Sequence, residues 1–269
     1  MSGHPEFCFI TPISLLEQYA SQSTKHLCLA HLVDTSDVYA SFYKRMHERG
    51  DYVIMDCSAF ELGESYAPEK LLELGHKCSA NAIVLPDYPF KDSLKTIDAA
   101  KQWLPVIKQD GFDAFFCPQS LKGNLTDWLR GYDFAANNPD IDIIGMSILG
   151  IPNALPHIDY TYARVVMSQL LLSMQRFNTN KKHHYLGLNA SPNIEIPSLI
   201  NMQTIWSCDS SNPVWSGVNG HRYNPTSLDW LYIKKQFLPH VDFNIANPTL
   251  ERTHEIIQHN IDLTKGLFV

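Results

Sequence analysis

The chain has 269 residues, of which 45% are hydrophobic, and a formal net charge of −7. This length fits one large α/β domain or two small ones, and the apolar fraction suffices for a sizeable core. The acidic balance argues against a uniformly basic surface for nucleic acid, although it leaves room for a local basic patch.

No apolar run is as long as the roughly 18 residues of a membrane span, and the N-terminal residues lack a basic region followed by an apolar one. The six cysteines are scattered singly, several of them inside apolar runs. This pattern predicts buried free thiols in a reducing compartment, without a disulfide framework or a cysteine-rich zinc site. We therefore expect a cytoplasmic protein that does not contact a membrane.

Eight short apolar runs, rich in β-branched and aromatic residues, predict eight strands. In chain order they are Phe7–Ile10, His26–His31, Tyr52–Met55, Ala82–Leu85, Ala114–Cys117, Ile141–Ile148, His184–Leu188 and Thr204–Cys208. The stretches between them predict helices at Ile13–Ser21, Ser36–Arg49, Pro68–Cys78, Ser93–Asp110, Leu125–Asn137, Tyr160–Asn178 and Ile194–Met202. Caps or first-turn prolines are expected at Ser36, Pro68 and Thr126.

Alternation of strands and helices indicates βαβ units and a parallel sheet. Eight repeats predict a closed (β/α)8 TIM barrel, an α/β fold that typically takes about 250 residues. No linker, low-complexity tract or repeat divides the sequence, so residues 1–269 are predicted to form a single domain, with two tail helices in 225–269 that pack on the barrel. The alternative is an open doubly wound sheet. It would need a Gly-rich phosphate loop after the first strand, where the chain has Thr11-Pro12-Ile13.

Carboxylates stand at the ends of three predicted strands, at Asp56, Asp87 and Asp209. The active site of a TIM barrel lies at the C-terminal ends of its strands, so these side chains are expected to meet there. A segment rich in Gly and Asn follows Asp209, and such a backbone can bend closely around a ligand. Three acidic residues at the ends of three strands indicate a catalytic or binding site, because packing alone rarely needs them there. The alternative for Asp56 and Asp87 is that each closes a turn.

These strand ends resemble those of the tRNA-guanine transglycosylase superfamily, in the same order and at comparable spacing. The family's Asp-Ser-Gly-Gly-Phe-Gln motif, strand-five Gln and Ile-Gly-Gly-Leu turn correspond to Asp56-Cys-Ser-Ala-Phe60-Glu61, Gln119 and Ile144-Gly145-Met146-Ser147. Its His-Tyr-Leu-Met-Gly-Val-Gly strand resembles His184-Tyr185-Leu186-Gly187-Leu188, one residue shorter. Its Asp-x-x-x-Pro-x-x-x-Gly-x-Asn-Gly segment matches Asp209, Pro213, Gly217, Asn219 and Gly220.

The chain also departs from this family. The family's C-terminal zinc site needs a cysteine triplet and a later His, and no cysteine follows Cys208. The Arg-containing loop that helps the family hold tRNA is replaced by Val214-Trp215 and Val218. A shorter relative without these tRNA parts resembles the DNA 7-deazaguanine transglycosylases of bacterial and phage DNA modification. The resemblance thus implies a barrel that lacks the zinc subdomain and replaces guanine in DNA with a 7-deazaguanine derivative.

Base exchange with retention at C1′ needs a double displacement, in which one carboxylate attacks the sugar and a second group handles the proton. The resemblance implies Asp209 as the nucleophile that forms the covalent bond to C1′. Asp56 is the expected general acid and base, a role that would need partial burial or a neighbouring charge to tune its pKa.

The bound purine needs a complementary polar edge. Asp87 is expected to accept hydrogen bonds from N1–H and the 2-amino group. The purine O6 is expected to meet the amide of Gln119 and a backbone N–H of Gly145 or Met146. The alternative for Gln119 is a surface turn.

Three further residues are expected around the purine ring. Phe60 and Leu186 would sandwich it, as an aromatic residue and a Met do in the resembling family, and Gly187 would complete this side of the base pocket. The alternative for Phe60 is ordinary core packing.

Polar and basic residues predicted to contact nucleic acid near the barrel mouth are Asn219, Arg222, Lys122 and Lys182. His183 and His184 are adjacent, so in a strand they point to opposite faces and cannot chelate a metal together. We expect no metal and no cofactor.

The expected partners are DNA, guanine and a 7-deazaguanine such as preQ0 or preQ1, while a homodimer or an accessory protein stays open. Other functions remain alternatives: exchange on tRNA, base release to water by an N-glycosidase, and a non-catalytic binding subunit. The missing zinc site and Arg loop disfavour tRNA. The presence of both Asp56 and Asp209 disfavours a pure binder, which needs neither.

Overall fold

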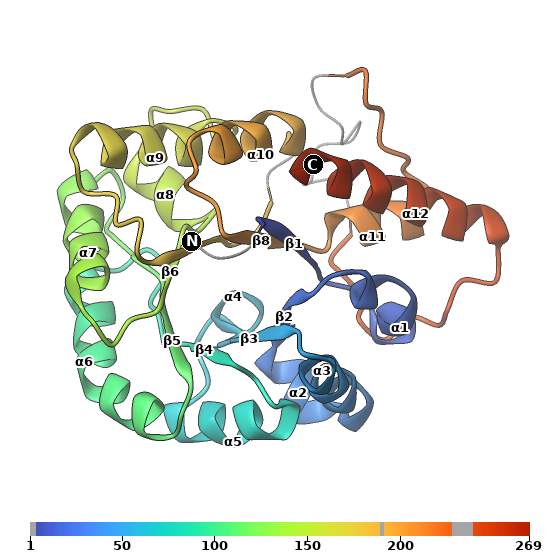
Figure 1. Ribbon diagram of the computed structural model, residues 1–269, viewed down its shortest axis with the longest axis horizontal. Coiled ribbons are helices and arrows are strands. Elements are labelled where there is room, and N and C mark those ends of the chain that lie inside the picture. Colours follow the sequence, from blue (N-terminus) through green and yellow to red (C-terminus); the bar gives the residue numbers. More distant parts are fainter. Residues whose placement is uncertain (1–3, 189–190, 228–238) are drawn as a thin grey trace.

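The computed structural model describes residues 4–188, 191–227 and 239–269, without the side chains of residues 60 and 61. Its centre is one sheet of eight parallel strands that curls into a barrel, with helices arranged around it (Figure 1). The strands are β1 (Glu6–Phe9), β2 (Lys25–Leu29), β3 (Tyr52–Asp56), β4 (Ala82–Val84), β5 (Asp113–Phe116), β6 (Ile143–Gly145), β7 (Lys182–Tyr185) and β8 (Ser207–Ser210). The predicted (β/α)8 barrel is confirmed.

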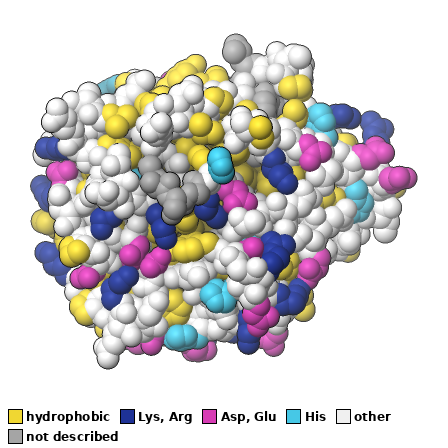
Figure 2. Space-filling view, in the orientation of Figure 1, with side chains coloured by type: hydrophobic (Ala, Val, Ile, Leu, Met, Phe, Trp, Pro, Cys, Tyr) yellow, Lys and Arg dark blue, Asp and Glu magenta, His cyan; other side chains and the backbone are white. Residues whose placement is uncertain are grey.

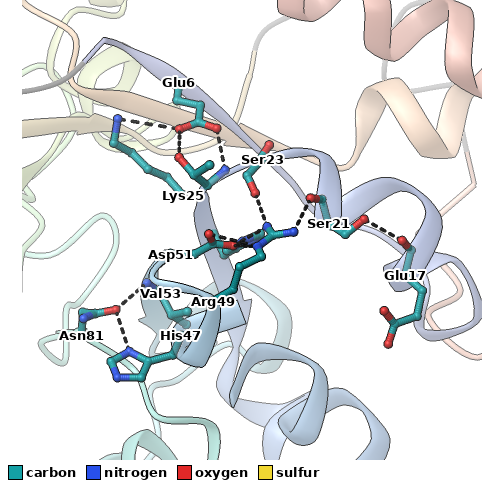
Figure 3. A network of polar contacts seen from close by, with 12 residues as sticks. Glu6, Glu17, Ser21, Ser23, Lys25, His47, Arg49, Asp51, Val53 and Asn81 are labelled. Atoms are coloured by element: carbon teal, nitrogen blue, oxygen red, sulfur yellow. Dashed lines mark hydrogen bonds and ion pairs between the residues drawn. The ribbon is translucent and has the colours of Figure 1, made fainter. Parts of the chain in front are cut away.

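Backbone pairing follows the order β1-β8-β7-β6-β5-β4-β3-β2, so β1 and β2 are the two ends of the ladder. Among the described residues these two strands share no backbone ladder, and side chains join them instead. Thr24 donates its N–H and its hydroxyl to the two carboxylate oxygens of Glu6, at 2.6 and 2.7 Å. Figure 3 shows Glu6 beside Lys25, whose ammonium lies 3.9 Å from the same carboxylate. The hydroxyl of Ser23 donates to the carbonyl of Phe7 at 2.5 Å. The barrel is therefore nearly closed, with one seam held by side chains.

The α-helices of the described residues alternate with these strands. They are α1 (Leu16–Tyr19), α2 (Ala30–Thr35), α3 (Asp37–Arg49), α4 (Ala59–Leu62), α5 (Pro68–Cys78), α6 (Ser93–Gln109), α7 (Leu125–Asn137), α8 (Gly150–Ala154), α9 (Ala163–Ser173), α10 (Pro192–Asn201), α11 (Asn212–Val218) and α12 (Glu251–Lys265). Four of them (α2, α4, α8 and α11) were not predicted. They have four to seven residues, too few for a helical period to show in the sequence.

The predicted helix starts are correct in two of three cases. The hydroxyl of Ser36 accepts the Tyr39 N–H and caps α3, and Pro68 is the first residue of α5. The cap predicted at Thr126 is wrong, because Asn124 caps α7 by accepting the N–H of Asp127 at 3.0 Å.

In the tail, α12 packs against α11, and the first of the two predicted tail helices falls partly on residues 228–238, outside the described residues. Gly217 makes this packing possible, since a Cβ there would lie 2.6 Å from the Ile257 side chain. Asn260 of α12 adds hydrogen bonds to the carbonyls of Pro213 and His221. The match of Gly217 to the family motif thus has a packing explanation.

All six cysteines are free and buried, as the sequence predicted. Within the described residues, no helix has the length and apolar character needed to cross a membrane. On the face viewed in Figure 2, Lys and Arg side chains are interspersed with Asp and Glu rather than gathered in one basic area.

Candidate active site

The C-terminal ends of the strands surround a cavity of about 180 Å³. A single water needs roughly 10–15 Å³ of such space, so the cavity can hold a ligand of ring size. All eight strands, or the loops that follow them, contribute to its lining, and the three strand-end acids Asp56, Asp87 and Asp209 all belong to it. The parallel barrel thus brings together carboxylates that lie far apart in the sequence.

Asp209 is the third residue of β8 and is 5% exposed. Its Oδ1 accepts two hydrogen bonds, one from the backbone N–H of Gly187 at 2.9 Å and one from Nε2 of His184 at 3.0 Å. Both bonds from described residues reach the same oxygen. The carboxylate is therefore oriented, with Oδ2 left for a ligand in the cavity.

His184 and Ser207 support Asp209 from below. The register of β7 and β8 places His184 opposite Ser207, and Ser207 lies two residues before Asp209 on the same face of β8. The Oγ of Ser207 lies 2.7 Å from Nδ1 of His184. Both side chains are fully buried. Adjacency in the sequence predicts that His184 faces away from His183, but no sequence pattern indicates its bond to Asp209.

His183 does face the other way, toward the helices. Its Nε2 lies 3.0 Å from the hydroxyl of Tyr132, and its ring stacks on Phe177 with centroids 4.1 Å apart. Burial lowers the pKa of His183 to about 3. This histidine is therefore a neutral part of the packing between sheet and helices.

Asp87 and Gln119 form a buried pair on the other side of the cavity. The Gln119 amide donates to Oδ2 of Asp87 at 2.5 Å, and the thiol of Cys57 lies 3.5 Å from Oδ1. Burial raises the pKa of Asp87, while hydrogen bonds from Gln119, Cys57 and Cys117 oppose the shift. Gln119 is 2% exposed, so it is not a surface turn residue.

The amide oxygen of Gln119 is also informative. The Oε1 of Gln119 is buried and has no hydrogen-bond partner within the described part of the chain. A buried acceptor without a partner costs about 1–3 kcal/mol. Gln119 lines the cavity but its Oε1 has almost no accessible surface, so a ligand N–H could satisfy this oxygen only after a shift of the Gln119 side chain.

Asp56 is the last residue of β3 and is half-buried. Its Oδ2 accepts the backbone N–H of Ser58 at 3.0 Å, which closes a tight turn. Ser58 adopts a left-handed conformation with φ of 58° and precedes α4. Asp56 therefore closes a turn and also lines the cavity, so the two predicted roles are compatible.

Leu186 and Gly187 lie at the end of β7 and line the cavity. Gly187 has φ of +68°, and a Cβ there would lie 2.8 Å from Ile148. Glycine is required here for two reasons, the left-handed backbone and the close approach of Ile148. This conformation directs the Gly187 N–H to Asp209.

The prediction for Gly145 and Met146 needs correction. The N–H of Met146 donates to the carbonyl of His184 at 2.8 Å, so the sheet already uses it and a purine O6 cannot. Gly145 of β6 pairs with His184 of β7, and a Cβ on Gly145 would lie 2.6 Å from the Phe115 ring. Both residues lie below the cavity, whose lining on this side begins at Ser147.

The predicted nucleic-acid contacts do not form one group. Lys182 is the first residue of β7, at the opposite end of the barrel from the cavity, and its ammonium pairs with Asp113 at 3.2 Å. The prediction that it lies near the mouth is therefore wrong. Asn219 directly follows α11 and donates to the Trp215 carbonyl, while Arg222 contacts His259.

Lys122 and Phe60 are the two remaining residues of the predicted site. Lys122 is exposed in the loop after β5, on the cavity side of the barrel. The stacking prediction for Phe60 falls on a side chain outside the described residues.

A buried ion pair holds the loops on one side of the cavity. The guanidinium of Arg164 in α9 binds both carboxylate oxygens of Glu195 in α10, at 2.6 and 2.7 Å. Its Nη1 also donates to the carbonyls of Met146 and Leu186, at 3.2 and 2.9 Å. Arg164 therefore connects the chain segments that leave β6 and β7. This pair cannot be predicted from the sequence, because an Arg and a Glu in separate helices have no characteristic spacing.

No protein-family model and no curated protein matches the sequence. Among the described residues, no group of three or more His, Cys, Asp or Glu side chains is arranged to hold a metal ion.

Proposed function

We propose that this protein is a base-exchange transglycosylase that replaces guanine in DNA with a 7-deazaguanine derivative through a covalent bond between Asp209 and C1′. One observation carries the proposal. A single cavity holds an oriented carboxylate (Asp209), a half-buried carboxylate (Asp56) and a buried acceptor pair (Asp87 and Gln119). These are the groups needed to attack the sugar, move a proton and select a base. The resemblance of the strand-end motifs to the tRNA-guanine transglycosylase superfamily supports the same reaction.

The Asp87 and Gln119 pair suits a purine with adjacent donors. The carboxylate of Asp87 and the unpartnered Oε1 of Gln119 are both acceptors. Guanine and its 7-deaza analogues present N1–H and a 2-amino group on one edge, which together supply the required donors. A base that lacks the 2-amino group would leave a buried acceptor unpaired, at a cost of about 1–3 kcal/mol. The pair therefore favours guanine over adenine.

The reaction has two half-steps. In the first, Oδ2 of Asp209 attacks C1′, the bond from C1′ to N9 breaks, and its electron pair leaves with guanine. The carboxyl of Asp56 supplies the proton that neutralises the departing base. In the second, N9 of the incoming 7-deazaguanine attacks C1′ and gives its proton to Asp56. The bond from C1′ to Oδ2 then breaks and its electron pair returns to Asp209.

The nucleotide must leave the base stack before this chemistry can begin. C1′ of a paired nucleotide cannot reach a carboxylate at the end of a barrel strand, so the target must be flipped out or single-stranded. The proposal of DNA as the polymer rests on the absence from the sequence of the tRNA-holding features of the resembling family. The mixed charge on the face viewed in Figure 2 gives no broad phosphate track there. Few phosphate contacts predict a shallow dependence of binding on salt.

Labelled guanine tests the proposal directly. The purified protein is incubated with labelled guanine and either duplex DNA or unmodified tRNA, and label is expected in DNA. Asp209→Asn keeps the shape of the side chain but removes the nucleophile, so it should abolish both exchange and a denaturant-resistant adduct. Asp98→Asn, which removes an exposed charge from α6, is the matched control and should exchange normally.

The outcomes separate the alternatives. Label in tRNA but not in DNA would overturn the choice of polymer. Release of free base without incorporation would identify an N-glycosidase. Normal exchange by Asp209→Asn would remove Asp209 as the nucleophile.

A further inference from the structure

The arrangement around Oδ1 of Asp209 has a use beyond holding the side chain. Asp209 receives hydrogen bonds from Gly187 and His184 on this one oxygen. The Gly187 bond comes from the backbone and cannot change its donor. The bond from His184 depends on which ring nitrogen carries the proton.

Ser207 is the partner of the other ring nitrogen. Its hydroxyl lies 2.7 Å from Nδ1 of His184 and can donate to that nitrogen. The proton of a neutral ring then sits on Nε2, which lies 3.0 Å from Oδ1 of Asp209. The opposite tautomer would turn a lone pair toward the carboxylate. Because Ser207 and His184 are fully buried, water cannot take over either bond.

We infer that His184, oriented by Ser207, is a positioning residue that acts through Asp209 and chiefly promotes the second half-step. This inference rests on the proposed function. While the sugar is bound to Oδ2, Oδ1 is the carbonyl oxygen of an uncharged ester. As C1′ leaves, negative charge returns to the carboxylate, and the two donors on Oδ1 stabilise that charge. Loss of the His184 donor therefore slows breakdown of the covalent intermediate more than its formation.

The test compares the two half-steps in variants. His184→Leu removes the donor, and Ser207→Ala removes only the hydrogen-bond partner of Nδ1, which holds the ring in place. Breakdown of the adduct in His184→Leu should slow about ten- to hundred-fold, the effect of losing a hydrogen bond to a charged group. The adduct with DNA should accumulate as a result. Ser207→Ala should shift in the same direction by a smaller factor, and His184→Gln, which keeps an N–H donor, should restore part of the breakdown rate.

His183→Leu is the matched control, since it removes the neighbouring buried histidine of β7 from the opposite face of the strand. It should lower stability but leave the ratio of the two rates unchanged. A merely structural role of His184 would slow both half-steps equally, and that result would overturn the inference. If the wild-type protein exchanges bases and His184→Leu keeps the wild-type ratio of the two half-step rates, only the role of His184 is refuted. Absence of both adduct and exchange in the wild-type protein would refute the proposed function and this inference together.

Discussion

The buried pair of Arg164 and Glu195 allows a quantitative prediction. Both side chains are at most 1% exposed, and together they form a bidentate contact. Replacing Arg164 by Met leaves the carboxylate of Glu195 buried without its partner. Breaking a buried pair in this way costs about 3–5 kcal/mol, a large part of the roughly 5–15 kcal/mol that stabilises a typical domain. Replacing Glu195 by Leu should cost a similar amount, because it strands the guanidinium.

The double variant makes the prediction specific. Arg164→Met/Glu195→Leu removes both charges, so no buried charge is left unpaired, and it should be more stable than either single variant. Exchange activity should still fall, because the carbonyls of Met146 and Leu186 lose their shared donor. Equilibrium unfolding in urea measures all three variants against the wild-type protein. Single variants that each lose less than about 1 kcal/mol, or a double variant that loses the sum of the two, would refute this reasoning.

Three further predictions concern single residues. Gly187→Ala places a Cβ 2.8 Å from Ile148 at φ of +68°, so it should cost about 1–2 kcal/mol in unfolding experiments and reduce exchange by displacing the N–H from Asp209. Burial raises the pKa of Asp87, so the folded protein holds this proton more tightly than the unfolded chain, and stability falls as pH rises from the unfolded value of 3.8 through the folded pKa. Asp87→Asn should therefore raise the melting temperature at neutral pH and abolish purine selection. In the wild-type protein, affinity for the base should fall as the pH drops through the raised pKa of Asp87. Ser36→Ala should cost about 1 kcal/mol by removing the cap of α3, with unchanged exchange kinetics.

The sequence predicted the barrel because its strands are short apolar runs separated by recognisable helices. For the same reason it predicted which acids lie together, since the ends of parallel strands meet at one end of a barrel. The prediction that Asp56, Asp87 and Asp209 share one site depended only on their positions at the ends of such runs. Short helices such as α4 and α8 remained hidden, because fewer than eight residues give no clear period.

Errors arose where the position of a residue within its strand mattered. Lys182 was placed at the mouth, but the strand begins at this residue and ends at Tyr185. Met146 was predicted to offer its N–H to a base, although the register of β6 and β7 commits that group to His184. The role of His184 depends on the same register, which places it opposite Ser207. In a hairpin the turn fixes the register, but these parallel strands are joined by helices, so the sequence contains no turn from which their register could be predicted.

The side-chain seam between β1 and β2 has a consequence for motion. Strands at the ends of a ladder open locally more readily than those in its middle, so amide hydrogen exchange should be faster in β1 and β2 than in β5 and β6. β1 pairs directly with β8, where Cys8 lies opposite Asp209. The strand that carries Asp209 therefore has a labile neighbour on one side and a protected one on the other. By taking its hydrogen bonds from His184 and Gly187, Asp209 is attached to the protected side, and transient opening of the seam can leave its geometry intact.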